Sequence, residues 1–370
     1  MPEVIKLRKG LDIKLKGTAE KELVAVKAAQ AYALVPDDFV GVTPKVIVAE
    51  GQHVKAGEAL FVDKKRPEVK FVSPVSGTVA AVNRGARRKV MSIVVTPDAK
   101  QEYAEFGVKS VHSLNGEQVK QALLDSGMFA FLRQRPYDVV ANPNSRPKAI
   151  FVSAFDSKPL APDFEYVIKG SEADFQAGLS ALAKMAPTYL GVSGKQTHIN
   201  IVDAKNVDIN VFKGKHPAGN VGVQINHLNP INKGDIVWTV GAEETIFIGR
   251  LFLNGACDFS QLVAVTGPRA NKPAYVKAVV GMPMQAIADQ ATADAEGLQA
   301  GCPVRFISGN VLTGTNVGAN GFLSFFDNQV TLITEGNYYE MFGWAKPFRC
   351  KKFSFSRSYF SWLTPKKQYA

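Results

Sequence analysis

Residues Lys45 to Val62 read K-V-I-V-A-E-G-Q-H-V-K-A-G-E-A-L-F-V. They are followed by V-K-F-V-S-P-V-S-G-T-V-A-A-V and by K-V-M-S-I-V-V. These runs are short and apolar, and turn glycines punctuate them at Gly51, Gly57, Gly77 and Gly85. Short β-forming runs separated by glycine turns are typical of hairpins. The stretch from Lys45 to Val95 therefore predicts a small sandwich of β-hairpins.

The same stretch resembles the barrel-sandwich fold of biotinyl and lipoyl carrier domains, through E-G-x-x-V-x-x-G-x-x-L and S-P-V-S-G-T-V. Those carriers place one modifiable lysine at a hairpin tip. Here the tip reads Asp63-Lys64-Lys65-Arg66-Pro67-Glu68, which departs from the biotin carriers' E-A-M-K-M and only half repeats the lipoyl carriers' D-K-A. A partial motif is weak support for a modification site. We therefore expect a structural domain and not a swinging arm.

The periodicity changes from about Asn115. The run 117–126 (E-Q-V-K-Q-A-L-L-D-S) has helical spacing and ends at a glycine, and 148–154 (K-A-I-F-V-S-A) is typical of a buried strand. A second helix is predicted over 172–185, where the Ser171 oxygen is expected to accept a backbone N–H in a capping box. The runs 197–202 (T-H-I-N-I-V) and 207–212 (V-D-I-N-V-F) then predict strands. This order indicates an α/β layer with a partly parallel sheet.

A third part follows after the strand D-I-V-W-T-V. Residues 243–253 (E-E-T-I-F-I-G-R-L-F-L) predict a helix, in which Glu243 and Glu244 are interpreted only as caps at its positive end. Strands are predicted at 261–265, 275–280 and 304–312, with a short helix from 284 to about 291. Strands around one short helix favour a small β-grasp-like unit.

The segment from Phe212 to Pro230 (F-K-G-K-H-P-A-G-N-V-G-V-Q-I-N-H-L-N-P) has the composition of a ligand site. Glycine lets the backbone approach an anion or a ring, and histidine binds metals and carries protons. His216 and His227 are eleven residues apart, however, with no third ligand at a known spacing. We expect no metal here, and interpret the segment as a glycine-shaped loop and strand that joins the α/β layer to the β-grasp unit and presents a surface to a partner.

Nucleotide and catalytic motifs are incomplete or absent in this sequence. In G-V-S-G-K-Q-T (191–197), Tyr189 stands where a phosphate loop needs glycine, and Gln196 stands where it needs Ser or Thr. No G-x-G-x-x-G follows a predicted strand, and G-x-S-x-G and H-E-x-x-H do not occur. Cys257, Cys302 and Cys350 are isolated and odd in number, which excludes a C-x-x-C metal site and indicates a reducing compartment. The sequence therefore assigns no catalytic, metal-binding or cofactor-binding residue.

The charge of the 370-residue chain indicates an acidic partner, because its formal net charge is +11 and its pI is about 9.4. Nucleic acid, an anionic membrane surface or merely a basic exterior would each account for it. The segment 349–367 adds six basic and five aromatic residues with no acid, which suits single-stranded nucleic acid, a lipid or protein surface, or a poorly ordered linker. The sequence shows no signal peptide and no apolar run long enough to span a bilayer.

Several stretches that run in order along the chain match one family. They are I-K-L-R-K-G-L-D-I-K-L-K-G (5–17), I-F-V-S-A-F-D-S-K-P-L-A-P-D (150–163), H-P-A-G (216–219), V-T-G-P-R (265–269), R-F-I-S-G-N-V-L-T-G (305–314) and F-G-W (342–344). With these motifs the chain resembles the NqrA family of the bacterial sodium-translocating NADH:quinone reductases. The resemblance implies a barrel-sandwich domain (1–105), a Rossmann-like α/β domain (106–260), a β-grasp-like (SLBB) unit (261–345) and a basic aromatic tail (346–370) that leads to a C-terminal segment missing here.

The resemblance also implies a function. The complex is a membrane-bound respiratory pump that passes electrons from NADH to ubiquinone and exports Na⁺. NqrA is its peripheral member on the cytoplasmic face of the membrane, docked on the membrane subunits and linked to the quinone end. We therefore expect no redox cofactor in this chain, ubiquinone as a possible ligand, the other subunits as partners, only indirect contact with the membrane surface, no nucleic acid, and no activity of the isolated chain.

The candidate partner or quinone surface on this resemblance is His216, Gly219 and His227. Family members read G-P-H-P-A-G-L-x-G-T-H-I-H-F-L-D-P in this segment, whereas this chain has Gln224 and Asn226 in place of histidines. That departure weakens a histidine cluster that would bind metal or relay protons. The alternatives are a stand-alone flavin or NADH oxidoreductase, suggested by the α/β layer, and a nucleic-acid-binding protein, suggested by the charge.

Overall fold

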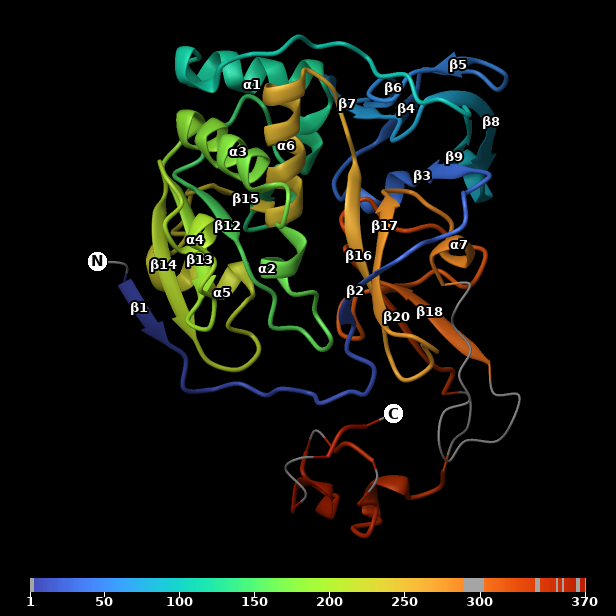
Figure 1. Cartoon of the computed structure of the whole chain (residues 1–370), viewed down its shortest axis with the longest axis vertical. Helices are drawn as coiled ribbons and strands as arrows, with labels where there is room; N and C mark the ends of the chain where they lie inside the picture. Colours follow the sequence, from blue (N-terminus) through green and yellow to red (C-terminus); the bar gives the residue numbers. More distant parts are fainter. Residues whose placement is uncertain are drawn as a thin grey trace.

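The chain folds into three units followed by a tail, as the computed structural model in Figure 1 shows. The structure describes residues 3–288, 303–336, 340–350, 352–354, 356–363 and 367–369. Its strands form a seven-stranded sheet, a six-stranded sheet, and two smaller sheets of four and three strands. The α/β domain, the barrel-sandwich domain and the SLBB unit expected from the sequence are thus all present.

The seven-stranded sheet is the centre of the α/β domain. In spatial order its strands are β1 (Glu3–Lys6), β14 (Asp208–Lys213), β13 (Thr188–Ser193), β12 (Ile150–Ser153), β15 (Val237–Gly241), β10 (Arg133–Arg135) and β11 (Val139–Val140). The strands from β1 to β15 are parallel, and β10 and β11 form an antiparallel hairpin on the β15 edge. From β12 the chain goes to β13 and β14 on one side and then returns to β15 on the other. The strand order therefore reverses between β12 and β15, which is the position where open α/β sheets bind ligands.

Helices cover both faces of this sheet, so its central strands are buried on both sides. On one face, Ile150 and Val152 belong to the main core with α1 (Gly116–Asp125), α3 (Glu172–Met185) and α6 (Ala242–Asn254). On the other face, Phe151 packs with Ile225 of α5 (Val221–Leu228). This alternation follows the two-residue period of a strand. The short helices α2 (Phe164–Val167) and α4 (Ile199–Val202) complete the domain.

The barrel-sandwich domain consists of the two smaller sheets, as the opening stretch predicts. One sheet has β4 (Pro44–Val46), β6 (Ala59–Asp63) and β7 (Arg66–Val72), and the other has β3 (Tyr32–Leu34), β9 (Val90–Pro97), β8 (Gly77–Arg84) and β5 (His53–Val54). The tip of the β6–β7 hairpin is docked on the α/β domain. Arg66 pairs with buried Asp63 (Nε to Oδ2, 2.7 Å) and donates Nη1 to the carbonyl oxygens of Val140 (3.2 Å) and Ala141 (3.1 Å). A docked tip fits the structural role expected for this domain.

The SLBB unit is built on the six-stranded sheet and the short helix α7 (Met284–Ala288). Its strands in spatial order are β19 (Thr315–Asn316), β18 (Val304–Ser308), β20 (Gln329–Thr334), β16 (Ser260–Thr266), β17 (Ala274–Val279) and β2 (Glu20–Val24). The three strands predicted after residue 260 are confirmed, although β18 ends at Ser308 and not near 312. The end of the short helix predicted near residue 291 lies outside the described residues.

The two strands described between Glu3 and Val24 pair outside the barrel-sandwich domain that follows them. Strand β1 pairs with β14 of the α/β domain, and β2 pairs with β17 of the SLBB unit. The chain therefore passes along both other units before it enters the barrel sandwich. Strand pairing thus ties the start of the domain expected over residues 1–105 to both other units.

Three local predictions are wrong. Ser171 makes no side-chain cap to α3; its Oγ accepts from Arg250 Nη2 (3.3 Å) instead. The predicted strand 197–202 is instead the short helix α4, and Glu165 Oε1 accepts from the backbone N–H groups of Thr197 and His198 directly before it (2.5 and 2.7 Å). In the segment Phe212–Pro230 the end of β14 is followed by the expected loop, but the helix α5 stands where a strand was expected, and the segment stays within the α/β domain between β14 and β15.

The segment 324–329, which leads into β20, joins the three units. Phe325 stacks on Phe131 of the α/β domain (ring centroids 5.1 Å apart) and lies 5.0 Å from Phe39 of the barrel sandwich. Its backbone N–H donates to Asp38 Oδ2 at 2.9 Å. We name residues 324–329 the junction segment, because this short part of the SLBB unit contacts both the α/β domain and the barrel sandwich.

We predict that Phe325→Ala lowers the free energy of unfolding by about 3–5 kcal/mol, because it leaves a cavity among rings from different domains. Urea denaturation followed by intrinsic fluorescence measures this change. Phe342→Ala, at a ring that is 65% exposed, is the matched control and should change stability by less than about 0.5 kcal/mol. Equal effects of the two substitutions would contradict the assignment.

Candidate functional site

A cavity of about 590 Å³ lies where the strand order reverses. Its floor is the carboxyl edge of β12 and β15, and its roof is the junction segment with the loop after β18. A cavity of this size accommodates a small organic ligand. The residues that line it from the α/β domain include Phe131, Arg133, Arg135, Asp138, Ser153, Asp156, Lys158, Gly219, Asn220, Glu243 and Glu244, and those from the SLBB unit include Asn310, Thr313, Asp327, Asn328 and Gln329.

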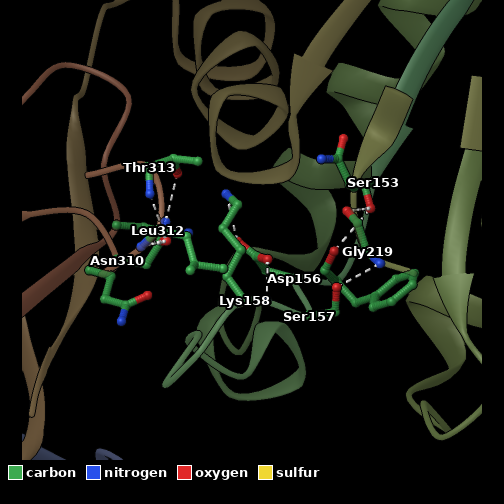
Figure 2. Close-up of polar contacts among 12 residues, drawn as sticks. Ser153, Asp156, Ser157, Lys158, Gly219, Asn310, Leu312 and Thr313 are labelled. Atoms are coloured by element: carbon green, nitrogen blue, oxygen red, sulfur yellow. Dashed lines mark hydrogen bonds and ion pairs between the residues drawn. The ribbon is translucent and has the colours of Figure 1, made fainter. Parts of the chain in front are cut away.

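The loop after β12 forms one wall and is fixed by its own hydrogen bonds (Figure 2). Ser157 Oγ accepts from the backbone N–H of Gly219 at 2.9 Å, and Ser153 Oγ donates to the Gly219 carbonyl at 3.3 Å. A Cβ on Gly219 would lie 2.6 Å from the backbone nitrogen of Ser157. Glycine is therefore required at 219 for this close approach.

Lys158 lies between the two domains that enclose the cavity, as Figure 2 shows. Its Nζ pairs with Asp156 Oδ2 at 3.0 Å. Across the cavity, Asn310 Oδ1 accepts from the backbone N–H groups of Leu312 (2.9 Å) and Thr313 (3.2 Å). Both walls are thus held in place by internal bonds, which leaves the cavity shape largely preformed.

Two acids occupy the floor at the start of α6. Burial raises the pKa of Glu244 to about 8, and the neighbouring Glu243 carboxyl acts in the same direction. Burial also raises the pKa of Glu243, whose Oε1 accepts from Asn328 Nδ2 at 2.6 Å. Glu244 folds back over Gly241, where a Cβ would collide with its carboxyl group. At neutral pH the Glu244 side chain is mostly a neutral carboxylic acid, which can donate a hydrogen bond.

The other two domains add acids to the same junction. Burial raises the pKa of Asp327, whose Oδ2 accepts from Ser308 Oγ at 2.6 Å. Burial raises the pKa of Asp38 in the barrel sandwich to about 6, with a smaller contribution from Asp327. All three domains therefore bury a carboxyl group of raised pKa at one place.

These acids decide what the α6 end of the cavity can hold. In nucleotide-binding α/β folds the helix N-terminus after such a strand receives phosphate. Here the carboxyl groups of Glu243 and Glu244 fill that position, and each accepts from its own backbone N–H. The floor therefore does not suit a diphosphate. The cavity offers donors from Glu244, Arg133 and Lys158 and aromatic walls to a compound with acceptor atoms.

The structure brings together two of the three residues predicted for the partner or quinone surface. His216 Nδ1 lies 3.1 Å from Ser157 Oγ, and Gly219 lines the cavity. His227 lies seven residues beyond Asn220, the cap of α5, which places it about 10 Å along the helix axis. Its Nδ1 contacts the Val223 carbonyl at 2.8 Å. Within the described part of the chain, His, Cys, Asp and Glu nowhere form a group of three that could hold a metal ion.

Glu243 and Glu244 are the candidate-site residues that sequence reasoning missed. The sequence predicted only helix caps, whereas both line the cavity. Their position directly after a buried parallel strand, at V-W-T-V-G, was the available signal. Cys257 is not part of the site; it is buried, and burial raises the pKa of its thiol to about 12. Cys350 is exposed, and Cys302 lies outside the described residues.

Comparison with known proteins agrees with this architecture. Family models match residues 5–98 ("NqrA N-terminal barrel-sandwich hybrid domain"), 114–257 ("NqrA second alpha/beta domain") and 262–319 ("NQRA C-terminal domain"). The chain is 40% identical over 367 residues to the NqrA protein of the Na(+)-translocating NADH-quinone reductase of Serratia proteamaculans, across 96% of this chain and 79% of the relative. The corresponding protein of Yersinia pestis bv. Antiqua is 35% identical over 375 residues, across 99% and 81%.

The chain belongs to the NqrA family. Membership confirms the resemblance found in the sequence and the expected fold class. A solved NAD⁺-reducing [NiFe]-hydrogenase shows a weak likeness, with a TM-score of 0.42 and 16% identity over 60% of this chain and 47% of that chain. That likeness is too weak to bear on fold or function. In the described part of this family member, every helix is too short or too polar to cross a membrane.

We predict that Glu244→Gln makes stability less dependent on pH. In the folded chain the pKa of Glu244 is about 8, well above the ordinary value of 4.5, so folding takes up a proton between these values. The stabilisation is complete below pH 4.5 and is lost as the pH rises through 8. The wild-type free energy of unfolding should therefore fall between about pH 6 and about pH 9, and that of Glu244→Gln should fall less.

Urea denaturation at the two pH values measures this difference. Glu68→Gln, at an exposed position, is the control and should follow the wild type. Parallel pH profiles for the wild type and Glu244→Gln would show that Glu244 is not the buried acid described.

Proposed function

We propose that this chain is the NqrA component of a sodium-translocating NADH:quinone reductase and contributes to assembly or to the quinone end of that complex. The observation that carries the proposal is the match to the NqrA relatives over 96% and 99% of the chain. All three family domains occur in the family's order. In this role the chain acts as part of the enzyme complex, and the isolated chain is inactive.

The geometry of the cavity supports a role without a redox cofactor of its own. Glu243 and Glu244 fill the helix terminus that a nucleotide phosphate would need. The strand-to-helix turn there reads V-W-T-V-G-A-E-E, without a glycine fingerprint. Electron transfer then belongs to other subunits, and this chain supplies a surface.

We place that surface at His216 and Gly219. Both contact Ser157, whose neighbours Asp156 and Lys158 line the cavity, so a ligand or partner there would meet an ordered loop. The chain sits peripherally on the cytoplasmic face of the membrane in this proposal, with the membrane and soluble subunits as partners and ubiquinone as the ligand. His227, at the far end of α5, belongs to a separate surface.

A complementation experiment tests the proposal. We expect this chain to restore Na⁺-stimulated NADH:quinone reductase activity to membranes of a host that lacks its own NqrA. It should also co-purify with the membrane subunits. Failure of both, with the chain folded by circular dichroism, would contradict the proposal.

Paired variants in the same experiment test the placement of the surface. We expect His216→Ala to lower quinone reduction by several-fold while co-purification persists, because the His216 contact to Ser157 orders the cavity wall. His227→Ala is the matched control and should retain activity. The bound-metal content should be the same in the wild type and both variants, and an equal loss of activity in both variants would contradict the placement.

One observation favours a second function, a stand-alone flavin or NADH oxidoreductase. The cavity lies at the reversal of strand order, where many α/β folds bind a nucleotide. The absorbance spectrum of the purified chain separates the two functions. A flavin band in the visible region that persists after gel filtration would favour the oxidoreductase.

A further inference from the structure

The hairpin between β8 and β9 carries a dense basic cluster at its tip. Residues 83–89 (N-R-G-A-R-R-K) are all exposed, and four of them are basic. We call residues 84–89 the basic tip. It belongs to the barrel-sandwich domain and lies outside the residues that line the cavity.

The backbone of the basic tip is strained at two adjacent arginines. Arg87 has φ of +55° and Arg88 has φ of +58°, which is the left-handed region. Asn and Gly are the usual residues at such positions of a hairpin turn, because a longer side chain with a Cβ is disfavoured there. Side chains kept at a strained backbone position often have a functional reason. Arginine at these two positions therefore lowers the stability of the turn and adds two positive charges to its surface.

The two strained arginines are also the unpaired ones. Arg84 donates Nη1 to the Arg88 carbonyl at 3.2 Å within the hairpin, and Lys89 pairs with Asp37 of the preceding 36–38 turn at 2.6 Å. The side chains of Arg87 and Arg88 make no hydrogen bond or ion pair with any residue that the structure describes. Two adjacent guanidinium groups are therefore available to an external anion.

We propose that the basic tip binds the phosphates of anionic lipid headgroups at a membrane surface. Guanidinium groups bind phosphate oxygens in a bidentate manner. A protein partner would need an apolar centre to the contact. The exposed neighbours Asn83, Gly85 and Ala86 are small or polar, and the apolar Met91 beside Gly85 is 44% exposed, which is far less apolar surface than such a centre needs. Binding to a layer of anionic headgroups requires only cations on the protein surface. This contact goes beyond the proposed function, in which membrane subunits hold the chain at the membrane.

Co-sedimentation of the full chain with vesicles tests this contact at low salt. The probes are vesicles of phosphatidylcholine alone and vesicles in which about a third of the lipid is phosphatidylglycerol. We expect binding only to the anionic vesicles, and roughly 30-fold weaker binding for R87N/R88G, which removes two cations from the surface. The control K64Q/K65Q neutralises the exposed lysines at the β6–β7 tip of the same domain and should stay within about threefold of the wild type.

The same variant also provides a folding control. R87N/R88G places the preferred residues at the two left-handed positions, so its melting temperature should rise while its vesicle binding falls. Equal losses of binding in both double variants would mean that net charge alone acts, and would overturn the proposal. Wild-type binding that does not prefer phosphatidylglycerol, or unchanged binding by R87N/R88G, would overturn it as well. The proposed place in the reductase complex is unaffected by either result, since complementation tests it separately.

Discussion

The hydrogen bond from the Phe325 N–H to Asp38, with the ring stacked on Phe131, is the contact on which the arrangement of the domains depends. It lies in the junction segment, between the SLBB sheet and the other two units. Two further side chains of this segment reach the α/β domain. Asn328 donates to Glu243 at 2.6 Å, and Gln329 donates to the Pro159 carbonyl at 3.2 Å. One short segment therefore fixes the roof of the cavity relative to its floor.

The junction segment makes one favourable and one unfavourable contribution to the stability of the fold. Rings from three parts of the chain pack around Phe325, and burial of aromatic side chains is among the largest stabilising contributions available. Carboxyl groups of Asp38, Asp327, Glu243 and Glu244 are buried beside them, which is costly unless they are protonated or hydrogen-bonded. At neutral pH the Glu244 carboxyl, with a pKa of about 8, is mostly protonated, which relieves its part of this cost. The other three accept hydrogen bonds, Asp38 from the Phe325 N–H, Asp327 from Ser308 and Glu243 from Asn328. The cavity is consequently a polar space enclosed by a well-packed aromatic cluster.

Sequence patterns predicted the parts of the fold that depend on local periodicity. The hairpins of the barrel sandwich, α1 with its end at Gly127, the buried strand β12 and the helix α6 all follow from the spacing of apolar residues and glycines. The predictions failed where a distant residue decides the outcome. At 197–202, where a strand was predicted and the helix α4 is found, the backbone N–H of His198 is bound by Glu165 from 33 residues away.

The site was less predictable than the fold, for the same reason. Glu243 and Glu244 have the composition of ordinary helix caps, and their burial depends on contacts far apart in sequence, such as the one from Asn328 of the SLBB unit to Glu243. Histidine and glycine in Phe212–Pro230 pointed to the correct wall of the cavity through His216 and Gly219. The same pattern included His227, which the α5 helix carries away from that wall. The pairing of β1 and β2 with separate sheets has no signal in local sequence.

Hydrogen–deuterium exchange of the native chain tests the central claim most directly, namely that the junction segment locks three domains into one body. The amides to follow are those of Phe325, which donates to Asp38, and Ala264, which donates to the Asn328 carbonyl at 2.9 Å. If the account is correct, both amides exchange only through global unfolding, with the same free energy as the core strand β12. Exchange of Phe325 through a local opening of much lower free energy, while β12 stays protected, would contradict it.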